Sequence, residues 1–258
     1  MYALYYSGGD KMRTIVVFSG AGLSAESGID TFRAVDGLWE KHKIEDVASP
    51  EGWERDKEMV LRFYAERFQG VKNAEPNEAH KSIARLEEKF NVINITQNVD
   101  DLLERAGCTN VQHVHGKLNE RKCEWHHNIS NLDGDTQFAC DYLVEQTEPV
   151  NLGELCPKCN GQMRPNVVWF KEAVDLGYDR IVDLVREVKY GNGVFICIGT
   201  SANVAPASLL IPFFSQVMNK YIINSKTWKI SDYTLLEGQA TEQMSKLAEE
   251  LLNPSVSS

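Results

Sequence analysis

The chain has 258 residues, of which 43% are hydrophobic, and its formal net charge is −10 with a pI near 5.2. This length allows one large or two small domains with a sizeable core. The acidic balance argues against a protein that follows nucleic-acid phosphates, and it is compatible with basic protein partners such as lysine-rich segments.

The N-terminal part of the chain combines a predicted strand with a glycine-rich loop. The strand covers residues 14–18, and the loop SGAGLSAESGIDTFR follows at residues 19–33. Gly20, Gly22 and Ala25 have the G-x-G-x-x-A spacing of a dinucleotide-binding turn, in which small residues permit a tight turn, close approach of a pyrophosphate and close packing of the next helix. The same spacing also occurs in ordinary strand-to-helix turns. No basic n-region or long apolar run precedes the strand, so we expect no secretory signal.

The next hundred residues alternate between helical and strand patterns. Residues 57–68 have helical spacing, and Tyr64 and Arg67 are neighbours on one face because they are three positions apart. Further predicted helices lie at 76–90 and 101–106, and predicted strands lie at 91–96 and 111–114. This order predicts an α/β fold with a parallel sheet.

Residues 117–165 interrupt the alternation. This stretch is polar, shows little periodicity and contains a C-x-x-C pair. Its candidate metal ligands are Cys123, His126, His127, Cys140, Cys156 and Cys159. In a chain without an export signal, this cysteine usage indicates reduced thiols with a possible metal site in a small inserted module.

The α/β pattern returns after the insertion. Predicted helices lie at 176–188, 205–218 and 240–252, and predicted strands at 193–198, 221–223 and 232–235. Residues 190–219 carry no charge, but Pro206, Pro212 and the polar run 199–203 leave apolar parts too short to cross a bilayer. We therefore expect no membrane span.

Five polar clusters follow the ends of predicted strands. They are residues 20–33, 97–100, 115–116, 199–201 and Asn224. Serine, asparagine and glycine form turns in many proteins. Five such clusters together favour one ligand site, because ligands of open α/β sheets bind beyond the carboxyl ends of the strands.

Six ordered motifs give the chain a family resemblance. GAGLSAESGIDTFR, TQNVD, HVHG, CPKC, RPNVVWF and GTS resemble the sirtuin family of NAD-dependent protein lysine deacylases, over about residues 14–252. The run AESGIDTFRAVDGLWE and the pair Tyr64 and Arg67 are similar to the bacterial CobB type and the desuccinylase-like class. The resemblance implies a Rossmann-like doubly wound parallel sheet with a smaller helical and zinc-binding domain. The implied bounds are about 11–37, 77–116 and 172–258 for the large domain, 38–76 for the helical insertion and 117–171 for the zinc module.

The resemblance also implies an NAD site and a catalytic pair. His115 would be the general base that takes a proton from a ribose hydroxyl, and Asn98 would orient a water or a ribose hydroxyl. Read alone, His115 would be a strand-end histidine that caps a backbone group, but the glycine after it and the cluster at residues 97–100 favour the base; His113 receives no role. The implied NAD-binding residues are Gly20, Ala21, Gly22, Ser24, Ala25, Phe32, Arg33, Trp39, Gln97, Asn98, Asp100, Gly199, Thr200, Ser201, Asn224 and Ala240.

Two further features concern the substrate. A phenol and a guanidinium on one helix face suit a carboxylate, so Tyr64 and Arg67 would select succinyl- and malonyl-lysine; otherwise Tyr64 is a core residue and Arg67 a solvated charge. Val167, Val168, Trp169 and Phe170 would form an edge strand that pairs with substrate backbone, or simply a buried strand. Lys171 stands where the family usually has glycine.

The zinc motif departs most from the family pattern. Cys156 and Cys159 form one pair, and Cys123 with His126 would form the other as C-x-x-H. Either Cys140 or His127 would be the alternative fourth ligand. A zinc ion with four protein ligands would be structural, and the alternative is a module held by packing alone.

The implied activity is removal of acetyl, succinyl or malonyl groups from protein lysines, giving nicotinamide, O-acyl-ADP-ribose and free lysine. Two alternatives remain: an NAD glycohydrolase or ADP-ribosyltransferase, and a non-catalytic zinc and NAD binding module. We expect acylated lysine side chains as partners, no nucleic acid or membrane, and a cytoplasmic location; the oligomeric state is not predicted.

Overall fold

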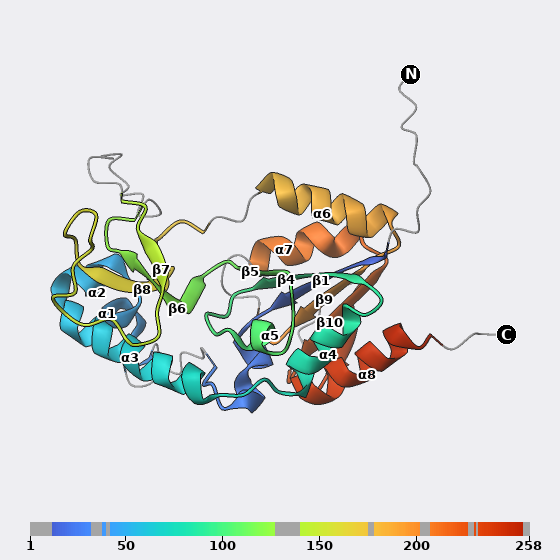
Figure 1. Ribbon diagram of the computed structural model, residues 1–258. Helices are drawn as coiled ribbons and strands as arrows, with labels where there is room; N and C mark the ends of the chain where they lie inside the picture. The colour runs from blue at the N-terminus through green and yellow to red at the C-terminus, as the bar shows by residue number, and fades with distance from the viewer. Residues whose placement is uncertain are drawn as a thin grey trace, which may run out of the picture.

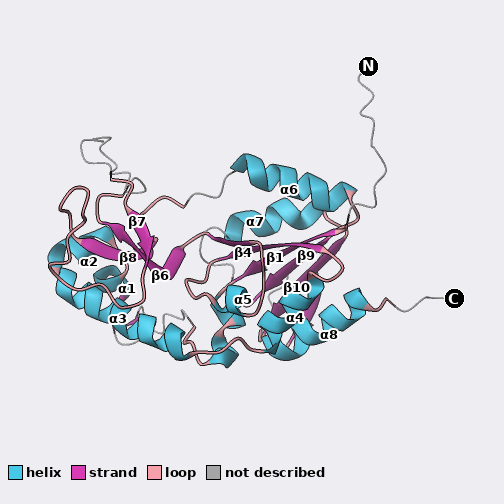
Figure 2. Cartoon of the chain, viewed as in Figure 1, coloured by secondary structure: helices cyan, strands magenta, loops and turns pink. Residues whose placement is uncertain are grey.

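The chain folds into two lobes that lie side by side (Figures 1 and 2). The structure is a computed structural model that describes residues 12–31, 38–39, 42–126, 140–174, 178–201, 207–226, 230 and 232–254. The site predictions for Phe32 and Arg33, and the alternative zinc ligand His127, fall outside these residues. Of Trp39 only the backbone is described.

The large lobe is built on a six-stranded sheet in which every pairing is parallel. The spatial order is β11-β10-β9-β1-β4-β5, so the chain first builds outward from β1 in one direction and then from β9 in the other. This is the Rossmann order, and its switch point lies between β1 and β9. The strands are β1 (Thr14–Ser19), β4 (Asn91–Thr96), β5 (Val111–His113), β9 (Val194–Ile198), β10 (Asn219–Asn224) and β11 (Thr234–Glu237).

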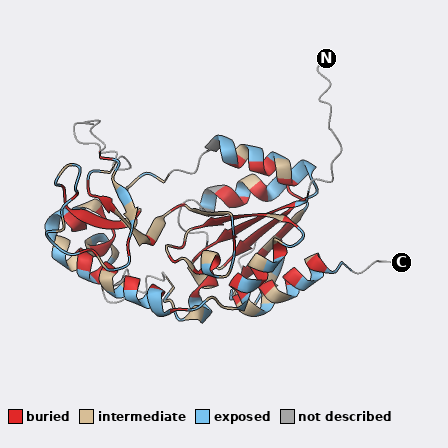
Figure 3. Cartoon of the chain, viewed as in Figure 1, coloured by how far each residue is buried: buried red, intermediate tan, exposed pale blue. Residues whose placement is uncertain are grey.

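Helices cover both faces of this sheet, as Figure 3 shows by the buried strands between them. The helices α4 (Glu78–Leu86) and α8 (Ala240–Leu252) share a core with Ile15 and Val17 of β1. The helices α6 (Tyr178–Tyr190) and α7 (Ala207–Phe213) share the opposite core with Val16 and Phe18. Because successive side chains of a strand point to opposite faces, an uninterrupted apolar strand such as β1 is buried on both sides. The short helix α5 (Leu102–Arg105) follows β4.

The small lobe packs three helices against an antiparallel sheet. Its sheet has the order β7-β6-β8, and a single core joins Trp53, Tyr64 and Trp169 from its different elements. Its elements are the hairpin strands β2 (Leu38–Trp39) and β3 (His42–Lys43), the helices α1 (Ile44–Val47), α2 (Pro50–Arg55) and α3 (Lys57–Asn73), and the strands β6 (Gly116–Cys123), β7 (Leu143–Glu145) and β8 (Met163–Val167).

Most predicted elements of the large lobe are confirmed, and the differences have local reasons. The strand at 91–96 and the helix at 240–252 have the predicted bounds. The glycine-rich loop at residues 19–33 contains two short 3-10 helices, η1 (Ala21–Leu23) and η2 (Ala25–Ser27). The predicted helix at 205–218 is shorter, since α7 gives way to the 3-10 helix η3 (Phe214–Gln216) after Pro212.

The predicted strand at Val167–Phe170 is wrong in its bounds. β8 ends at Val167. The backbone N–H of Val168 then donates to the His115 carbonyl at 2.9 Å, and that of Phe170 to the Ala48 carbonyl at 3.0 Å. The first bond continues the register in which Gly116 pairs with Val167, and the second ties Phe170 to the residue that follows α1. Within the part of the chain that the structure describes, no helix is long and apolar enough to cross a bilayer.

Candidate functional site

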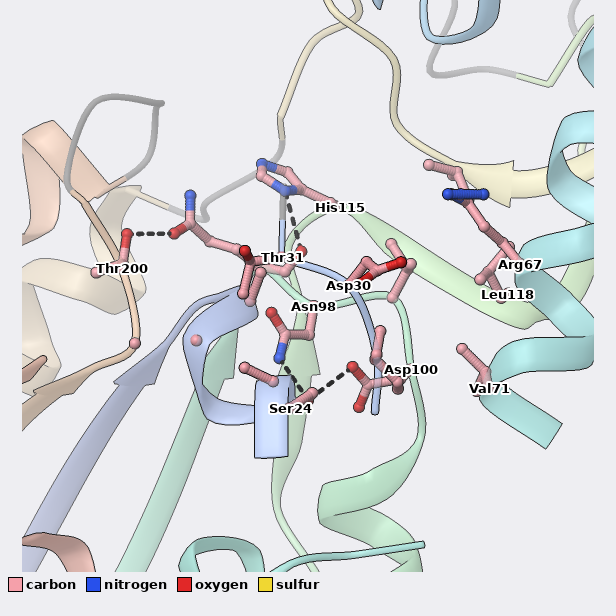
Figure 4. Close-up of a pocket in the computed structure, with 18 of the residues that line it drawn as sticks. Ser24, Asp30, Thr31, Arg67, Val71, Asn98, Asp100, His115, Leu118 and Thr200 are labelled. Atoms are coloured by element: carbon pink, nitrogen blue, oxygen red, sulfur yellow. Dashed lines mark hydrogen bonds between the residues drawn. The ribbon is translucent and has the colours of Figure 1, made fainter. Parts of the chain in front are cut away.

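A cavity of ≈ 880 Å³ lies between the two lobes, beyond the carboxyl ends of the large-lobe strands. It is lined by side chains from both lobes, and Figure 4 shows part of this lining. The predicted site residues that line it are Ala21, Gly22, Ser24, Ala25, Tyr64, Arg67, Gln97, Asn98, Asp100, His115, Val167, Val168, Trp169, Phe170, Gly199, Thr200, Ser201, Asn224 and Ala240. The five polar clusters therefore converge on one cavity, as the sequence predicts.

The floor of the cavity is formed where the loops after β1 and β9 touch. The backbone N–H of Gly20 donates to the Ile198 carbonyl at 3.0 Å, and that of Gly22 to the Gly199 carbonyl at 2.8 Å. A Cβ at Gly22 would lie 2.7 Å from the Gly199 Cα. Gly199 itself has φ +68, and a Cβ there would lie 2.3 Å from the Leu23 nitrogen. Both positions therefore need glycine, and this part of the wall is bare backbone to which a pyrophosphate has access.

Next to this floor, Ser24 joins three polar side chains. Its hydroxyl donates to Asp100 Oδ2 at 2.9 Å and accepts from Asn98 Nδ2 at 3.0 Å (Figure 4). Burial raises the pKa of Asp100, and the hydrogen bond from Ser24 opposes this shift. The side-chain amide nitrogen of Asn98 donates to Ser24. The side-chain oxygen of Asn98 is therefore on the side that faces His115 in Figure 4.

His80 completes this network and was missed by the sequence reasoning. Its Nδ1 accepts from the Asn77 backbone N–H at 3.3 Å, so its Nε2 carries the proton and faces the Ser24 hydroxyl at 3.4 Å. Burial lowers the pKa of His80 to about 4, which keeps the ring neutral near pH 7. The only sequence signal was the three-residue spacing from Asn77 to His80, which forms a capping box at the start of α4.

His115 lies between the sheet and the small lobe, and its protonation is set by Gln97. Its Nδ1 lies 3.1 Å from the Gln97 carbonyl oxygen. A carbonyl only accepts, so Nδ1 carries the proton and Nε2 is the basic nitrogen of the neutral ring. The Gln97 side chain in turn accepts from the Thr200 hydroxyl at 3.1 Å, and Asn224 donates to the Thr200 carbonyl at 2.7 Å. These bonds connect the loops after β4 and β9 with the last residue of β10.

Tyr64 and Arg67 lie on the small-lobe side of the cavity. In Figure 4, His115 lies between Thr200 and Arg67, so the guanidinium is on the side of the cavity away from the sheet switch point. The Arg67 guanidinium lies 4.0 Å above the Phe63 ring. Tyr64 is 1% exposed, and its oxygen accepts from Trp169 Nε1 at 3.1 Å. Tyr64 is thus both a core residue and a cavity-lining residue.

Comparison with known proteins agrees with this architecture. The Sir2 family model matches residues 20–206. The chain belongs to the Sir2 family. It is 44% identical over 202 residues, 76% of each chain, to a protein of Vibrio parahaemolyticus named NAD-dependent protein deacylase.

Solved structures show the same relationship. A Sir2 homologue in complex with NAD is 37% identical, with a TM-score of 0.76 over 94% of this chain and 90% of that one. A structure described as Sir2 with a p53 peptide and NAD+ is 26% identical, with a TM-score of 0.71 over 93% and 94% of the two chains.

The zinc site expected from the Sir2 family resemblance is made of four cysteines. The sulfurs of Cys123, Cys140, Cys156 and Cys159 all lie within 4.8 Å of one another. Two of the distances are 3.3 Å and 3.7 Å. A tetrahedral zinc ion with sulfur at about 2.3 Å requires about 3.8 Å between sulfurs, so the arrangement fits a structural zinc ion that leaves no open position.

The prediction of His126 as a zinc ligand is therefore corrected to Cys140. His126 forms a backbone bridge with Cys140, and it lies outside the group of four ligands. The bridge brings Cys140 back beside Cys123, and the spacing of the cysteines along the chain did not reveal this.

Lys171, which replaces the usual Sir2 family glycine, adopts the backbone conformation of a glycine. Its φ is +73, in the left-handed region. Its side chain pairs with Glu51 of α2. The next residue, Glu172, also holds this turn, because its carboxylate accepts from the Trp169 backbone N–H at 2.8 Å.

Proposed function

We propose that this chain is an NAD-dependent protein-lysine deacylase whose cavity binds NAD on the sheet side and an acylated lysine on the small-lobe side. One observation carries the proposal: the glycine floor, His115 and the pair Tyr64 and Arg67 line the same cavity. The relatives named NAD-dependent protein deacylase and the NAD complex of a Sir2 homologue support it. The p53 peptide of another relative supports a protein or peptide partner.

The residues of the sheet side suit the parts of NAD. The bare backbone at Gly22 and Gly199 would take the pyrophosphate, and Asn224 at the end of β10 would take the adenosine ribose. Asp100 offers an acceptor for the carboxamide N–H of nicotinamide. The side-chain oxygen of Asn98, which faces His115, would accept from a ribose hydroxyl or from a water.

The reaction uses His115 as a base. The acyl carbonyl oxygen would attack the anomeric carbon of the ribose while nicotinamide leaves. Nε2 of His115 would then take a proton from a ribose hydroxyl, which attacks the resulting imidate; water completes the release of lysine and O-acyl-ADP-ribose. The Gln97 carbonyl holds Nδ1–H, so the basic nitrogen needs no change of tautomer.

The small-lobe side would favour acyl groups that end in a carboxylate. Arg67 supplies a guanidinium, which binds carboxylates through two parallel N–H donors. Burial raises the pKa of Tyr64, so its hydroxyl stays protonated and is able to donate. We propose succinyl- and malonyl-lysine as substrates alongside acetyl-lysine. The reduced cysteines suit the reducing environment of a cytoplasm.

A peptide assay tests the proposal. The protein is incubated with acetyl-, succinyl- and malonyl-lysine versions of one peptide, with and without NAD, and the peptide and nicotinamide are followed by mass spectrometry. We expect NAD-dependent deacylation with one nicotinamide released per lysine freed. Nicotinamide release without deacylation would point to glycohydrolase or ADP-ribosyl transfer, and no turnover at all would point to a binding module.

A further inference from the structure

A buried network surrounds Trp169, at the boundary between the acyl side of the cavity and the small-lobe core. The indole is 4% exposed, and its Nε1–H donates to the Tyr64 oxygen at 3.1 Å. The bond is between two groups taken out of water, so it is stronger and more directional than the same bond at the surface.

The indole is held in place from several sides. Arg164 lies 3.6 Å above the ring, and Trp53 packs against it with ring centroids 5.5 Å apart. The Glu172 carboxylate accepts from Arg164 at 2.5 Å with one oxygen and from the Trp169 backbone N–H at 2.8 Å with the other. The side chains of Arg164 and Glu172 are 0% and 2% exposed. Both the backbone and the side chain of Trp169 are therefore held in place.

This arrangement restricts the direction of the Tyr64 O–H. An oxygen that accepts from the indole directs its own O–H elsewhere. Within the described part of the chain, no hydrogen bond from the Tyr64 hydroxyl to an acceptor is present. Tyr64 and Arg67 both line the cavity, so an acceptor in the cavity would meet both donors.

We propose that Trp169 is a positioning residue for acyl selectivity: its indole N–H orients the Tyr64 hydroxyl so that the proton points at the carboxylate of a succinyl or malonyl group. The inference rests on the proposed role of Tyr64 and Arg67 in binding that carboxylate. Trp169 acts through Tyr64, and a neutral acetyl group would gain little from it. Phenylalanine at position 169 would keep an aromatic ring but lose the N–H donor together with part of the buried ring system.

A double-mutant cycle tests this inference. The variants Trp169→Phe, Tyr64→Phe and the double variant are assayed with succinyl- and acetyl-lysine peptides, and the ratio of the two kcat/KM values is compared. Tyr64→Phe removes a hydrogen bond to a charged group, so we expect the ratio to fall about tenfold. Trp169→Phe leaves the Tyr64 hydroxyl in place but removes its orientation, so we expect the ratio to fall about fivefold. The double variant should match Tyr64→Phe within about twofold, because Trp169 then has no hydroxyl to orient.

Trp53→Phe is the matched control. It makes the same change in the same core, but the Trp53 Nε1–H donates to Glu124 at 3.0 Å and not to Tyr64. We expect it to leave the selectivity ratio unchanged, even where it lowers stability. A ratio that falls for Tyr64→Phe but not for Trp169→Phe would overturn this inference alone. The inference also fails if Trp169→Phe lowers the ratio equally in both backgrounds. A ratio unaffected by Tyr64→Phe would overturn the carboxylate role as well.

Discussion

The imidazole of His113 lies 2.9 Å from a carboxylate oxygen of Glu104. The other ring nitrogen lies 2.8 Å from the Asn98 carbonyl oxygen, and the side chain is 3% exposed. Both partners are acceptors, so each ring nitrogen that carries a proton has a partner to which it is able to donate. His113, to which the sequence assigned no role, thus fixes the backbone of Asn98 in the cavity.

Glu104 should make the stability of the protein depend on acid pH. Burial raises the pKa of Glu104, but hydrogen bonds and charge from His113, with a bond from Lys117, bring it down to about 2 from 4.5. A depressed carboxyl pKa contributes stability above the unfolded value, and this stability is lost as the pH falls from 4.5 toward 2. We expect Glu104→Gln to cost about 1–2 kcal/mol at pH 7 in urea unfolding, and less at pH 3. The exposed Glu250→Gln should change little, and a cost for Glu104→Gln that is independent of pH would contradict the ion pair.

Glycine-to-alanine substitutions should have opposite effects on stability at Gly22, where the two glycine loops touch, and at Gly70. Gly22→Ala puts a methyl 2.7 Å from the Gly199 Cα, so we expect a loss of about 2 kcal/mol or more and much weaker NAD binding. Gly70→Ala in α3 meets nothing within 4 Å and should stabilise the helix by about 0.5–1 kcal/mol. Thermal unfolding and NAD calorimetry measure both. Equal tolerance of the two changes would contradict the close approach.

Loss of the Arg67 guanidinium should lower desuccinylation more than deacetylation. Arg67→Met keeps an apolar stem over Phe63 but removes the guanidinium. We expect kcat/KM for desuccinylation to fall about 10–100-fold more than kcat/KM for deacetylation. Arg62→Met, an exposed arginine of the same helix, is the control and should leave both rates unchanged. Equal loss of both activities in Arg67→Met would remove the carboxylate role.

The zinc content should depend on Cys140 and not on His126. We expect about one zinc per chain in the purified protein and in His126→Ala, and less than about half of that in Cys140→Ser. Atomic absorption on protein dialysed against metal-free buffer gives the measurement. Retention of full zinc by Cys140→Ser together with its loss in His126→Ala would restore the C-x-x-H interpretation.

Lys171 should carry a measurable backbone cost. At φ +73 a glycine is unstrained, whereas a residue with a side chain pays about 1 kcal/mol. Lys171→Gly and Lys171→Ala both remove the exposed ion pair with Glu51, which contributes little. We therefore expect the glycine variant to be more stable than the alanine variant by about 1 kcal/mol in denaturant unfolding. Equal stability would show that the turn relaxes.

Much of the site was predictable from sequence because its signals are local. The glycine spacing, the polar residues after each strand and His115 before Gly116 each occupy a few consecutive residues, and a parallel sheet necessarily gathers strand ends at one edge. Tyr64 and Arg67 were placed together by helix geometry alone. By contrast, His80 reaches Ser24 from 56 residues away, and Trp169 reaches Tyr64 from 105 residues away. Side-chain bonds of that range leave no periodic pattern.

The sequence by itself determined the parallel sheet, the polar clusters at the ends of its strands and the kind of ligand that these clusters suit. Apolar periodicity and turn residues act over short distances along the chain, so they can be recognised in the sequence. Tertiary structure decided which cysteine completes the zinc site, where β8 ends and which side chain donates to the Tyr64 oxygen. Each of these depends on two segments far apart in the chain being held in contact by a shared core. The physical reason is that buried hydrogen bonds and metal ligands are selected by distance in space, which spacing along the chain does not specify.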